Sequence, residues 1–259
     1  MRVAGCDIGS LTAKVIILKE NTIEAKAIIR CVSSPEKSAE SVISKALSQT
    51  GLALSDIDYI VGTGYGKNRI PFANHTESEI TCHAQGVFAL LPEARTLIDI
   101  GGQDAKVIKI SDEGQVCQYV YNDKCASGTG RFLEVMADAL EIPIDQMGEL
   151  HDQAKSQLHI SNQCVIFAES EVISLINEGK DTPDIIWGLH TALANRASSL
   201  ARSVGIVPDV VFTGGVAKNI GVAKALKRSI GLPLTDFPLD PQISGAYGAA
   251  ILASKHVAK

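Results

Sequence analysis

A ten-residue motif occurs twice in the chain, and this internal repeat restricts the possible folds more than any other feature. Residues 7–16 read DIGSLTAKVI and residues 99–108 read DIGGQDAKVI, so seven of the ten positions are identical without a gap. Each copy has an apolar run, a turn of small or polar residues and a second apolar run, which is typical of a β-hairpin. The repeat predicts two related domains that begin with the same hairpin.

Both hairpin tips carry groups that suit phosphate. Successive backbone N–H groups in a glycine-containing turn can bind an anion. We expect Asp7 and Asp99, at equivalent strand ends, to hold Mg²⁺ through water, because this ion gives up its hydration shell reluctantly. One such tip alone would more often be an ordinary turn. A third strand, VVFTGGVAKN at 210–219, ends in a glycine pair that would let a nucleotide approach the backbone.

The rest of the chain alternates strand and helix patterns. Strands are predicted at 20–31 and 57–61, and amphipathic helices at 36–50 and 76–91. The loop GTGYGK at 62–67 lacks the full P-loop pattern, so an ordinary turn is the favoured interpretation. The alternation predicts an α/β protein.

Composition limits the possible partners and compartment. The 259 residues are 46% hydrophobic and 20% charged with a net charge of −5, which argues against nucleic acid as the main partner. The sequence shows no signal peptide and no membrane-spanning apolar run, so we expect a cytoplasmic protein without a membrane partner. In that compartment the six cysteines are expected to be buried, metal-bound or redox-active thiols rather than a disulfide framework.

Two cysteines stand immediately before predicted helices. Cys125 precedes a glycine-rich turn and the helical run RFLEVMADAL, and Cys164 precedes VIFAESEVISLI. A helix N-terminus stabilises a thiolate, and two such residues supply half of a four-cysteine iron–sulfur site that a two-fold dimer could complete. From the residues alone, two buried thiols remain the simpler interpretation. The other cysteines fall in strand or helix patterns and are predicted to be core thiols: Cys6, Cys31, Cys82 and Cys117. His83, next to Cys82, is predicted to be half-exposed.

Several motifs together resemble a known ATPase superfamily. DIGS, DIGGQDAK and FTGGVAKN resemble, in this order, the phosphate-1, phosphate-2 and adenosine motifs of the actin, Hsp70 and sugar-kinase superfamily, and ISGAYGAAI at 243–251 resembles its second connecting segment. The closer resemblance is to the activator ATPases of 2-hydroxyacyl-CoA dehydratases and the ATPase subunits of benzoyl-CoA reductases. The stretches that carry it are TGYGKNRI, EITCHAQG, TLIDIGGQDAKVI, NDKCASGTGRFLEVMA, CVIFAESEVIS and FTGGVAKN. One departure is the first loop, which reads Ser-Leu-Thr-Ala where the family more often has Ser-Thr-Ala-Ser.

This resemblance implies a fold and an activity. The fold would be two ribonuclease-H-like α/β domains, residues 1–95 with 243–259 and residues 96–242, with ATP or ADP and Mg²⁺ in the interdomain cleft. The activity would be ATP-driven transfer of one electron by a homodimer that shares one [4Fe–4S] cluster between Cys125 and Cys164 of both subunits. The partner would be a 2-hydroxyacyl-CoA dehydratase or a related reductase, and the electron donor a reduced ferredoxin or flavodoxin.

The motif positions give a candidate set of nucleotide-binding residues. Gln103 and Asp104 are candidates for orienting the attacking water, because phosphoryl transfer needs mainly positioning and charge neutralisation. Lys14 is equally well explained as a phosphate contact or a solvated lysine, and Lys218 and Gln242 as adenosine contacts or surface residues. The full set is Asp7, Gly9, Ser10, Leu11, Thr12, Ala13, Lys14, Asp99, Gly101, Gly102, Gln103, Gly128, Thr129, Gly130, Gly214, Gly215, Lys218 and Gln242.

Two other functions remain open from the sequence. A small-molecule kinase of the same superfamily would need a substrate pocket with a catalytic base. A nucleotide-binding sensor would bind ATP without turnover and without iron. The helix that starts at residues 127–130 is expected to couple nucleotide and cluster in the activator interpretation.

Overall fold

Each copy of the repeated motif forms the hairpin at the start of a five-stranded sheet in the computed structural model. The structure describes residues 1–160 and 164–258. These residues form two compact units, the first made of 1–94, 110–117 and 237–259 and the second of 95–109 and 118–236. The α/β fold predicted from the sequence is confirmed, and the domain boundaries drawn there stay a prediction.

The sheet of the first unit combines antiparallel and parallel pairing. Its strand order is β3-β2-β1-β4-β5, with β1 antiparallel to β2 and parallel to β4. The strands are β1 (Arg2–Ile8), β2 (Thr12–Lys19), β3 (Thr22–Arg30), β4 (Tyr59–Thr63) and β5 (His75–Thr76).

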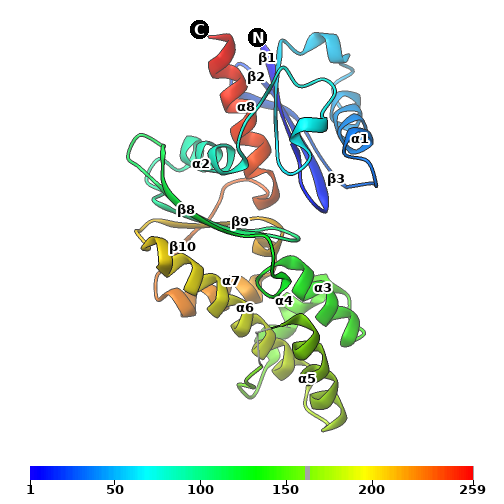
Figure 1. Cartoon of the computed structure of the whole chain (residues 1–259), viewed down its shortest axis with the longest axis vertical. Coiled ribbons are helices and arrows are strands. Elements are labelled where there is room, and N and C mark those ends of the chain that lie inside the picture. The colour runs from blue at the N-terminus through cyan, green and yellow to red at the C-terminus, as the bar shows by residue number, and fades with distance from the viewer. Residues whose placement is uncertain (161–163, 259) are drawn as a thin grey trace. The chain divides into compact units, whose positions relative to one another are not determined.

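Three helices cover the two faces of this sheet. They are α1 (Pro35–Ser48), α2 (Glu79–Leu90) and α8 (Ser244–Val257). Figure 1 shows α1 on one side of the strands and α8, in red, beside α2 on the other. Side chains of β1 alternate between these faces, so Cys6 packs in the cluster with α1 whereas Val3 packs in the cluster with α8. Gly5 allows this packing, because a Cβ there would lie 2.0 Å from the Ala246 carbonyl oxygen.

The first turns of α1 and α2 are built differently. Ser34 caps α1 by accepting a hydrogen bond from the Lys37 N–H, and Pro35 follows at the first helical position. In the second case, α2 begins at Glu79 after Ser78, and Thr76 belongs to β5. The predicted start of that helix at residue 76 is therefore wrong, because residue 76 belongs to a short strand and the helix begins three residues later.

The sheet of the second unit repeats the topology of the first. Its order is β10-β9-β6-β7-β8, so a hairpin again lies on one side of the first strand and parallel strands on the other. Asp7 pairs with Lys14 across one hairpin, and Asp99 pairs with Lys106 across the other, in the same register. The strands are β6 (Thr96–Ile100), β7 (Ala105–Ile110), β8 (Val116–Asn122), β9 (Val210–Thr213) and β10 (Leu234–Thr235).

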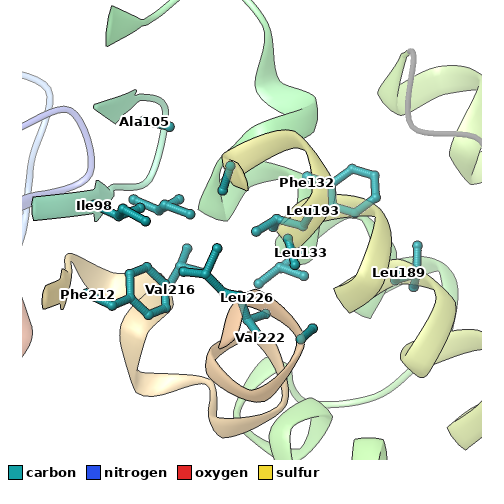
Figure 2. Close-up of a cluster of buried hydrophobic side chains, with 14 of the residues drawn as sticks. Ile98, Ala105, Phe132, Leu133, Leu189, Leu193, Phe212, Val216, Val222 and Leu226 are labelled. Atoms are coloured by element: carbon teal, nitrogen blue, oxygen red, sulfur yellow. The ribbon is translucent and has the colours of Figure 1, made fainter. Parts of the chain in front are cut away.

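Helices pack on one face of this second sheet around a large apolar core. Figure 2 shows side chains of the sheet, such as Ile98 and Phe212, meeting Phe132, Leu193 and Leu226 from the helices. The helices are α3 (Gly130–Ala139), α4 (Met147–Leu150), α5 (Val165–Asn177), α6 (Thr182–Val204) and α7 (Ile220–Ile230). Within the described ranges, no helix is long and apolar enough to cross a membrane.

Candidate functional site

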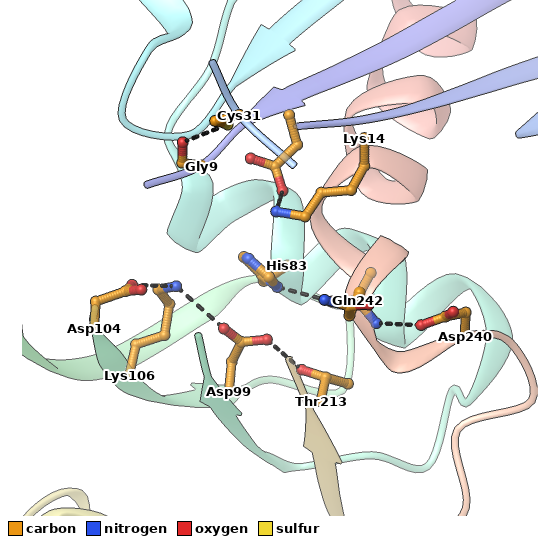
Figure 3. Close-up of polar contacts among 12 residues, drawn as sticks. Gly9, Lys14, Cys31, His83, Asp99, Asp104, Lys106, Thr213, Asp240 and Gln242 are labelled. Carbon is orange, nitrogen blue, oxygen red and sulfur yellow. Dashed lines mark hydrogen bonds and ion pairs between the residues drawn. The ribbon is translucent and has the colours of Figure 1, made fainter. Parts of the chain in front are cut away.

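The β1–β2 turn forms the first candidate loop. The Gly9 N–H donates to the Thr12 carbonyl at 3.1 Å, which closes the turn immediately after β1. Ser10, Leu11 and Thr12 are partly exposed at its tip, whereas Ala13 is buried in β2. Lys14 places its Nζ 3.0 Å from Asp7 Oδ2, so the strand-end carboxylate and the lysine form an ion pair (Figure 3).

Two glycines from neighbouring segments of the first unit lie close to the Asp7 carboxylate. Gly64 lies in the 62–67 loop with φ of +86°, and a Cβ there would be 2.4 Å from Asp7 Oδ1. A Cβ on Gly245 would lie 3.0 Å from His83 Nε2 and 3.3 Å from Asp7 Oδ2. The imidazole and the carboxylate therefore flank one glycine at the start of α8.

His83 is a candidate that the sequence did not single out. It is 6% exposed, and its Nδ1 lies 2.9 Å from the Ser244 hydroxyl. The prediction of a half-exposed side chain is wrong, because α8 covers this face of α2. The available signal was its place within EITCHAQG, one of the stretches that carry the family resemblance.

The β6–β7 turn forms the second candidate loop and has a denser polar network. The Gly101 N–H donates to the Asp104 carbonyl at 2.9 Å. Lys106 Nζ lies 3.1 Å from Asp99 Oδ1 and 2.5 Å from Asp104 Oδ2. Thr213, on the neighbouring strand β9, donates its hydroxyl to Asp99 Oδ2 at 2.7 Å (Figure 3). Lys106 and Thr213 were not predicted, although the repeat and the FTGG motif contain them.

The two candidates for positioning water have different environments. Gln103 is exposed at the tip of the second loop, beside the partly exposed Gly101 and Gly102. Asp104 is buried and ion-paired with Lys106. Only Gln103 is therefore accessible to a small molecule in solution.

The glycine-rich segment that leads into α3 is hydrogen-bonded to the second loop through the first two residues of the helix. The Gly130 N–H donates to the Gly101 carbonyl, and the Arg131 N–H donates to the Gly102 carbonyl, each at 2.8 Å. A Cβ on Gly130 would lie 3.0 Å from the Gly101 oxygen, so the close approach favours glycine. Gly128 and Thr129, in the same segment, are buried. The first turn of α3 is thus held by the phosphate-loop candidate.

The third glycine turn also lies against the second loop. Gly214 follows β9 with φ of +88°, and a Cβ there would be 2.2 Å from the Ile100 carbonyl oxygen. Gly215 then begins a 3₁₀ turn that ends at Lys218. Gln242 belongs to the other unit, where its N–H donates to Asp240 Oδ1 at 3.0 Å. The structure therefore brings Gly214 and Gly215 together with the end of β6, where the second loop begins.

Cys125 sits in a polar environment at the other end of the segment that leads into α3. Its Sγ lies 3.1 Å from the Ser127 hydroxyl. This hydrogen bond, and to a smaller degree the nearby Arg196 guanidinium, lowers the pKa of the thiol below its ordinary value. Arg196 reaches this turn because Gly128 has no side chain, since a Cβ there would lie 3.0 Å from Arg196 Cδ.

Cys164 is the residue immediately before α5 and is half-buried, as Cys125 is. The helices that follow the two cysteines, α3 and α5, pack against one another. Within residues 1–160 and 164–258, no three histidine, cysteine or acidic side chains gather in a metal-binding geometry.

The other four cysteines are not all core residues. Cys6 and Cys82 are fully buried, and burial raises the pKa of Cys82 to about 12. Cys31 is only partly buried and donates its thiol to the Gly9 carbonyl at 3.4 Å. Cys117 is exposed, because β8 is an edge strand whose residues 117–119 face solvent. The prediction of a core thiol is wrong for Cys117.

Comparison with known proteins assigns the family. The model of the BadF/BadG/BcrA/BcrD ATPase family matches residues 4–253. The chain belongs to this ATPase family. A relative in Anaerotignum propionicum, an activator of lactoyl-CoA dehydratase, is 46% identical over 253 residues, covering 98% of this chain and 97% of its own.

Solved structures of BadF/BadG/BcrA/BcrD-like activators superpose on the whole chain. Component A of the (R)-2-hydroxyglutaryl-CoA dehydratase from Acidaminococcus fermentans is 42% identical, with a TM-score of 0.96 and full coverage of both chains. The activator of 2-hydroxyisocaproyl-CoA dehydratase from Clostridium difficile, with bound ADPNP, is 42% identical, with a TM-score of 0.95 and coverage of 100% and 96%. A sugar kinase of the ROK family from Streptomyces griseus, at 13% identity over 98% and 100% of the two chains and a TM-score of 0.57, shares the fold alone.

Proposed function

We propose that this BadF/BadG/BcrA/BcrD-family ATPase hydrolyses ATP to deliver single electrons to a 2-hydroxyacyl-CoA dehydratase or a related acyl-CoA reductase. The observation that carries the proposal is the hydrogen-bonded contact between the second loop and the first turn of α3, next to Cys125. A loop suited to phosphate is thereby connected over a few residues to a thiol whose pKa is lowered. Relatives that are activators of 2-hydroxyacyl-CoA dehydratases support a partner enzyme of this class.

Nucleotide binding is proposed for the three glycine turns. In the first loop, residues 9–13 would offer backbone and hydroxyl groups to phosphate oxygens, and Lys14 a positive charge. In the second loop, Gly101 and Gly102 would do the same, while Asp7 and Asp99 would hold Mg²⁺ through water. Further contacts are proposed for Gly128, Thr129, Gly130, Gly214, Gly215, Lys218 and Gln242. An interdomain location for the nucleotide stays a prediction from the sequence.

Hydrolysis requires an oriented water molecule near the terminal phosphate. Gln103 is suited to this role because its amide can both donate and accept hydrogen bonds and its side chain is exposed. Asp104 is buried beside Lys106, so we assign it an indirect part in ordering the loop.

The thiols fit half of an iron–sulfur site. Cys125 has the lowered pKa that a thiolate ligand needs, and Cys164 precedes a thirteen-residue helix whose N-terminus favours negative charge. A second copy of the chain would bring the same two thiols and complete a four-cysteine set for one [4Fe–4S] cluster per homodimer. When bound, such a cluster supplies one-electron chemistry at low potential. The residues of this chain would hold it and transmit the nucleotide state to it.

Exposed apolar side chains on α5 support the homodimer. Ile166 and Phe167 are each 69% exposed and follow Cys164 directly, and Ile173 and Ile176 continue farther along the helix. Adjacent apolar side chains of this size are typical of interaction surfaces. A second copy would cover them at the place where the thiols must meet.

The proposed electron donor and location follow from the family resemblance. A reduced ferredoxin or flavodoxin is proposed as the electron donor, and a cytoplasmic location is proposed for the complex. The alternative of a small-molecule kinase is supported by the shared fold alone. Phosphorylation of a sugar by iron-free protein would nevertheless favour it.

Iron and sulfide analysis of anaerobically purified protein tests the proposal. We expect a brown dimer with about four Fe per dimer, from the ligand count of a four-cysteine cluster. Cys125→Ser and Cys164→Ser should each lose the iron, whereas Cys117→Ser, which removes an exposed thiol on β8, should keep it. Iron retained in both site variants, or ATP turnover by protein that binds no iron, would refute the assignment.

A further inference from the structure

Lys106 is a buried lysine to which the proposed reaction assigns no role of its own. Its side chain is 4% exposed, and its Nζ lies between Asp99 Oδ1 at 3.1 Å and Asp104 Oδ2 at 2.5 Å. The ring of Tyr121 also lies near, with its centroid 5.9 Å from the ammonium. Two buried carboxylates repel each other, and a cation between them offsets that repulsion and fixes their separation.

The first loop shows what is specific to this arrangement. Lys14 and Lys106 occupy the same register in the two hairpins, and each pairs with the aspartate across from it. Position 104, however, is aspartate in the second loop where the first has Thr12. The second carboxylate is therefore the one charge by which the two copies of the motif differ. The Lys14 side chain is 12% exposed and has one carboxylate partner at 3.0 Å.

The loop backbone ties this second carboxylate to the tip that carries Gln103. The Gly101 N–H donates to the Asp104 carbonyl, and a Cβ on Gly101 would lie 2.5 Å from Asp104 Oδ1. Asp104 thus fills the inside of the turn, with Gln103 immediately before it on the outside. Any change in the direction of the Asp104 side chain must alter the turn.

We propose that Lys106 is a positioning residue for ATP hydrolysis: by holding Asp99 and Asp104 together it sets the shape of the second loop and hence the direction of Gln103. The proposal rests on the proposed ATPase function and deepens it. Lys106 makes no phosphate contact in this account, because its ammonium is already enclosed by the two carboxylates and the ring. The two hairpin lysines therefore have different roles despite their identical register.

Steady-state ATP hydrolysis and nucleotide affinity, measured on the anaerobic holoprotein, test this role. Lys106→Met should lower kcat at least about tenfold, since a lost positioning contact removes about 1.4 kcal/mol or more of transition-state stabilisation. The Kd of a fluorescent ATP analogue should stay within about threefold, because phosphate binding is not lost. Lys109→Met, on the same strand but outside the loop, is the matched control and should behave as the wild type.

A double variant separates positioning from an independent effect. Asp104→Asn should already reduce kcat, and adding Lys106→Met should reduce it little further, because the two residues act through one contact. Lys106→Arg keeps the charge and should fold even where the methionine variant does not, with reduced kcat and unchanged Kd. Circular dichroism checks that each variant is folded.

Three results would overturn the inference. They are a Kd that rises as much as kcat falls, a double variant whose loss equals the product of the single losses, and wild-type kinetics in both Lys106 variants. Wild-type protein that hydrolyses ATP but binds no iron would refute the proposed electron transfer and leave the role of Lys106 intact. Wild-type protein without ATP hydrolysis would refute both.

Discussion

Gln103 and Asp104 are neighbours in the chain, but one faces solvent and the other is buried in an ion-paired network. Gln103→Ala should therefore slow ATP hydrolysis by about a hundredfold to a thousandfold, the range typical of a lost stabilising group. Nucleotide affinity should change little, because the backbone of the loop is unaltered. Single-turnover hydrolysis and analogue titration measure the two quantities, and an equal loss in both would show that Gln103 binds rather than orients.

The cysteines should differ in reactivity according to their surroundings. The Ser127 hydrogen bond lowers the pKa of Cys125, so more of this thiol is ionised at neutral pH and its thiolate fraction falls only at lower pH. Burial raises the pKa of Cys82 to about 12 and also that of Cys31. In metal-free protein, iodoacetamide should modify Cys125 well before Cys82.

Mass spectrometry of timed samples between pH 6 and 9 measures this order. Ser127→Ala should slow the modification of Cys125 and move its pH midpoint upward, with exposed Cys117 as the internal reference. If the modification rate of Cys125 is the same in Ser127→Ala as in the wild type, the hydrogen bond does not activate the thiol.

At the scale of residues, the sequence identified candidate phosphate-binding residues but not the side chains that contact them. The repeat identified Asp7 and Asp99, because identical letters in identical order mark equivalent backbone positions. It could not identify Thr213 as a partner of Asp99, since that contact depends on the parallel pairing of β6 with β9. His83 was misjudged for the same reason, because its burial depends on α8, which lies about 160 residues later.

At the scale of elements, a buried histidine pair links α6 to the 3₁₀ turn His151–Gln153, which follows α4. His190 is fully buried, and its Nδ1 lies 3.1 Å from the Nδ1 of His151. Asn219 caps α7 by accepting the Val222 N–H with Oδ1, so its amide nitrogen faces His190 Nε2 at 3.1 Å. This geometry requires a neutral imidazole with Nε2 unprotonated.

Acid should therefore destabilise the second unit. Burial, and then the nearby His151 and Arg228, lower the pKa of His190 to about 3 from about 6.5. Because the unfolded chain binds the proton more readily, this contribution is complete above pH 6.5 and is lost as the pH falls toward 3. The effect is on the order of a few kcal/mol. Charged neighbours of the pair are Arg228, Asp152 and Lys224.

Thermal unfolding between pH 7 and pH 4.5 at constant ionic strength measures this dependence. His190→Gln should flatten the fall in Tm, whereas His75→Gln, which changes an exposed histidine on β5, should not. An equally steep fall in the His190 variant would exclude this histidine as the cause.

Elements were easier to predict than their ends. Strands β1 and β2 follow directly from two apolar runs around a turn, and helix α1 from the helical period, with which the Ser34 cap agrees. The start of α2 was misplaced because Thr76 belongs to the short strand β5, and the helix begins only at Glu79, after Ser78. The exposure of Cys117 depends on β8 being an edge strand, which is a property of the sheet and not of the segment.

At the scale of the whole molecule, α5 carries the strongest prediction about assembly. Ile166→Glu combined with Phe167→Glu should convert the proposed homodimer to a monomer, because two charges replace apolar side chains that are each 69% exposed in one chain. Monomers would also lose iron, since each supplies only two of the four proposed thiols. Analytical ultracentrifugation measures the change, and Glu178→Gln at the far end of α5 is the control. If the double variant is still an iron-containing dimer, the dimer interface does not include these two side chains.

Nucleotide bound at the loops is proposed to change the surroundings of the thiols through α3. The rate at which an iron chelator removes iron from the dithionite-reduced holoprotein measures those surroundings without any partner enzyme. We predict rates that differ at least about tenfold between ATP- and ADP-bound protein, an energetic coupling of about 1.4 kcal/mol. Gly130→Ala should shrink this difference, because a Cβ there would press on the Gly101 oxygen. Equal rates with ATP, with ADP and without nucleotide would contradict the account.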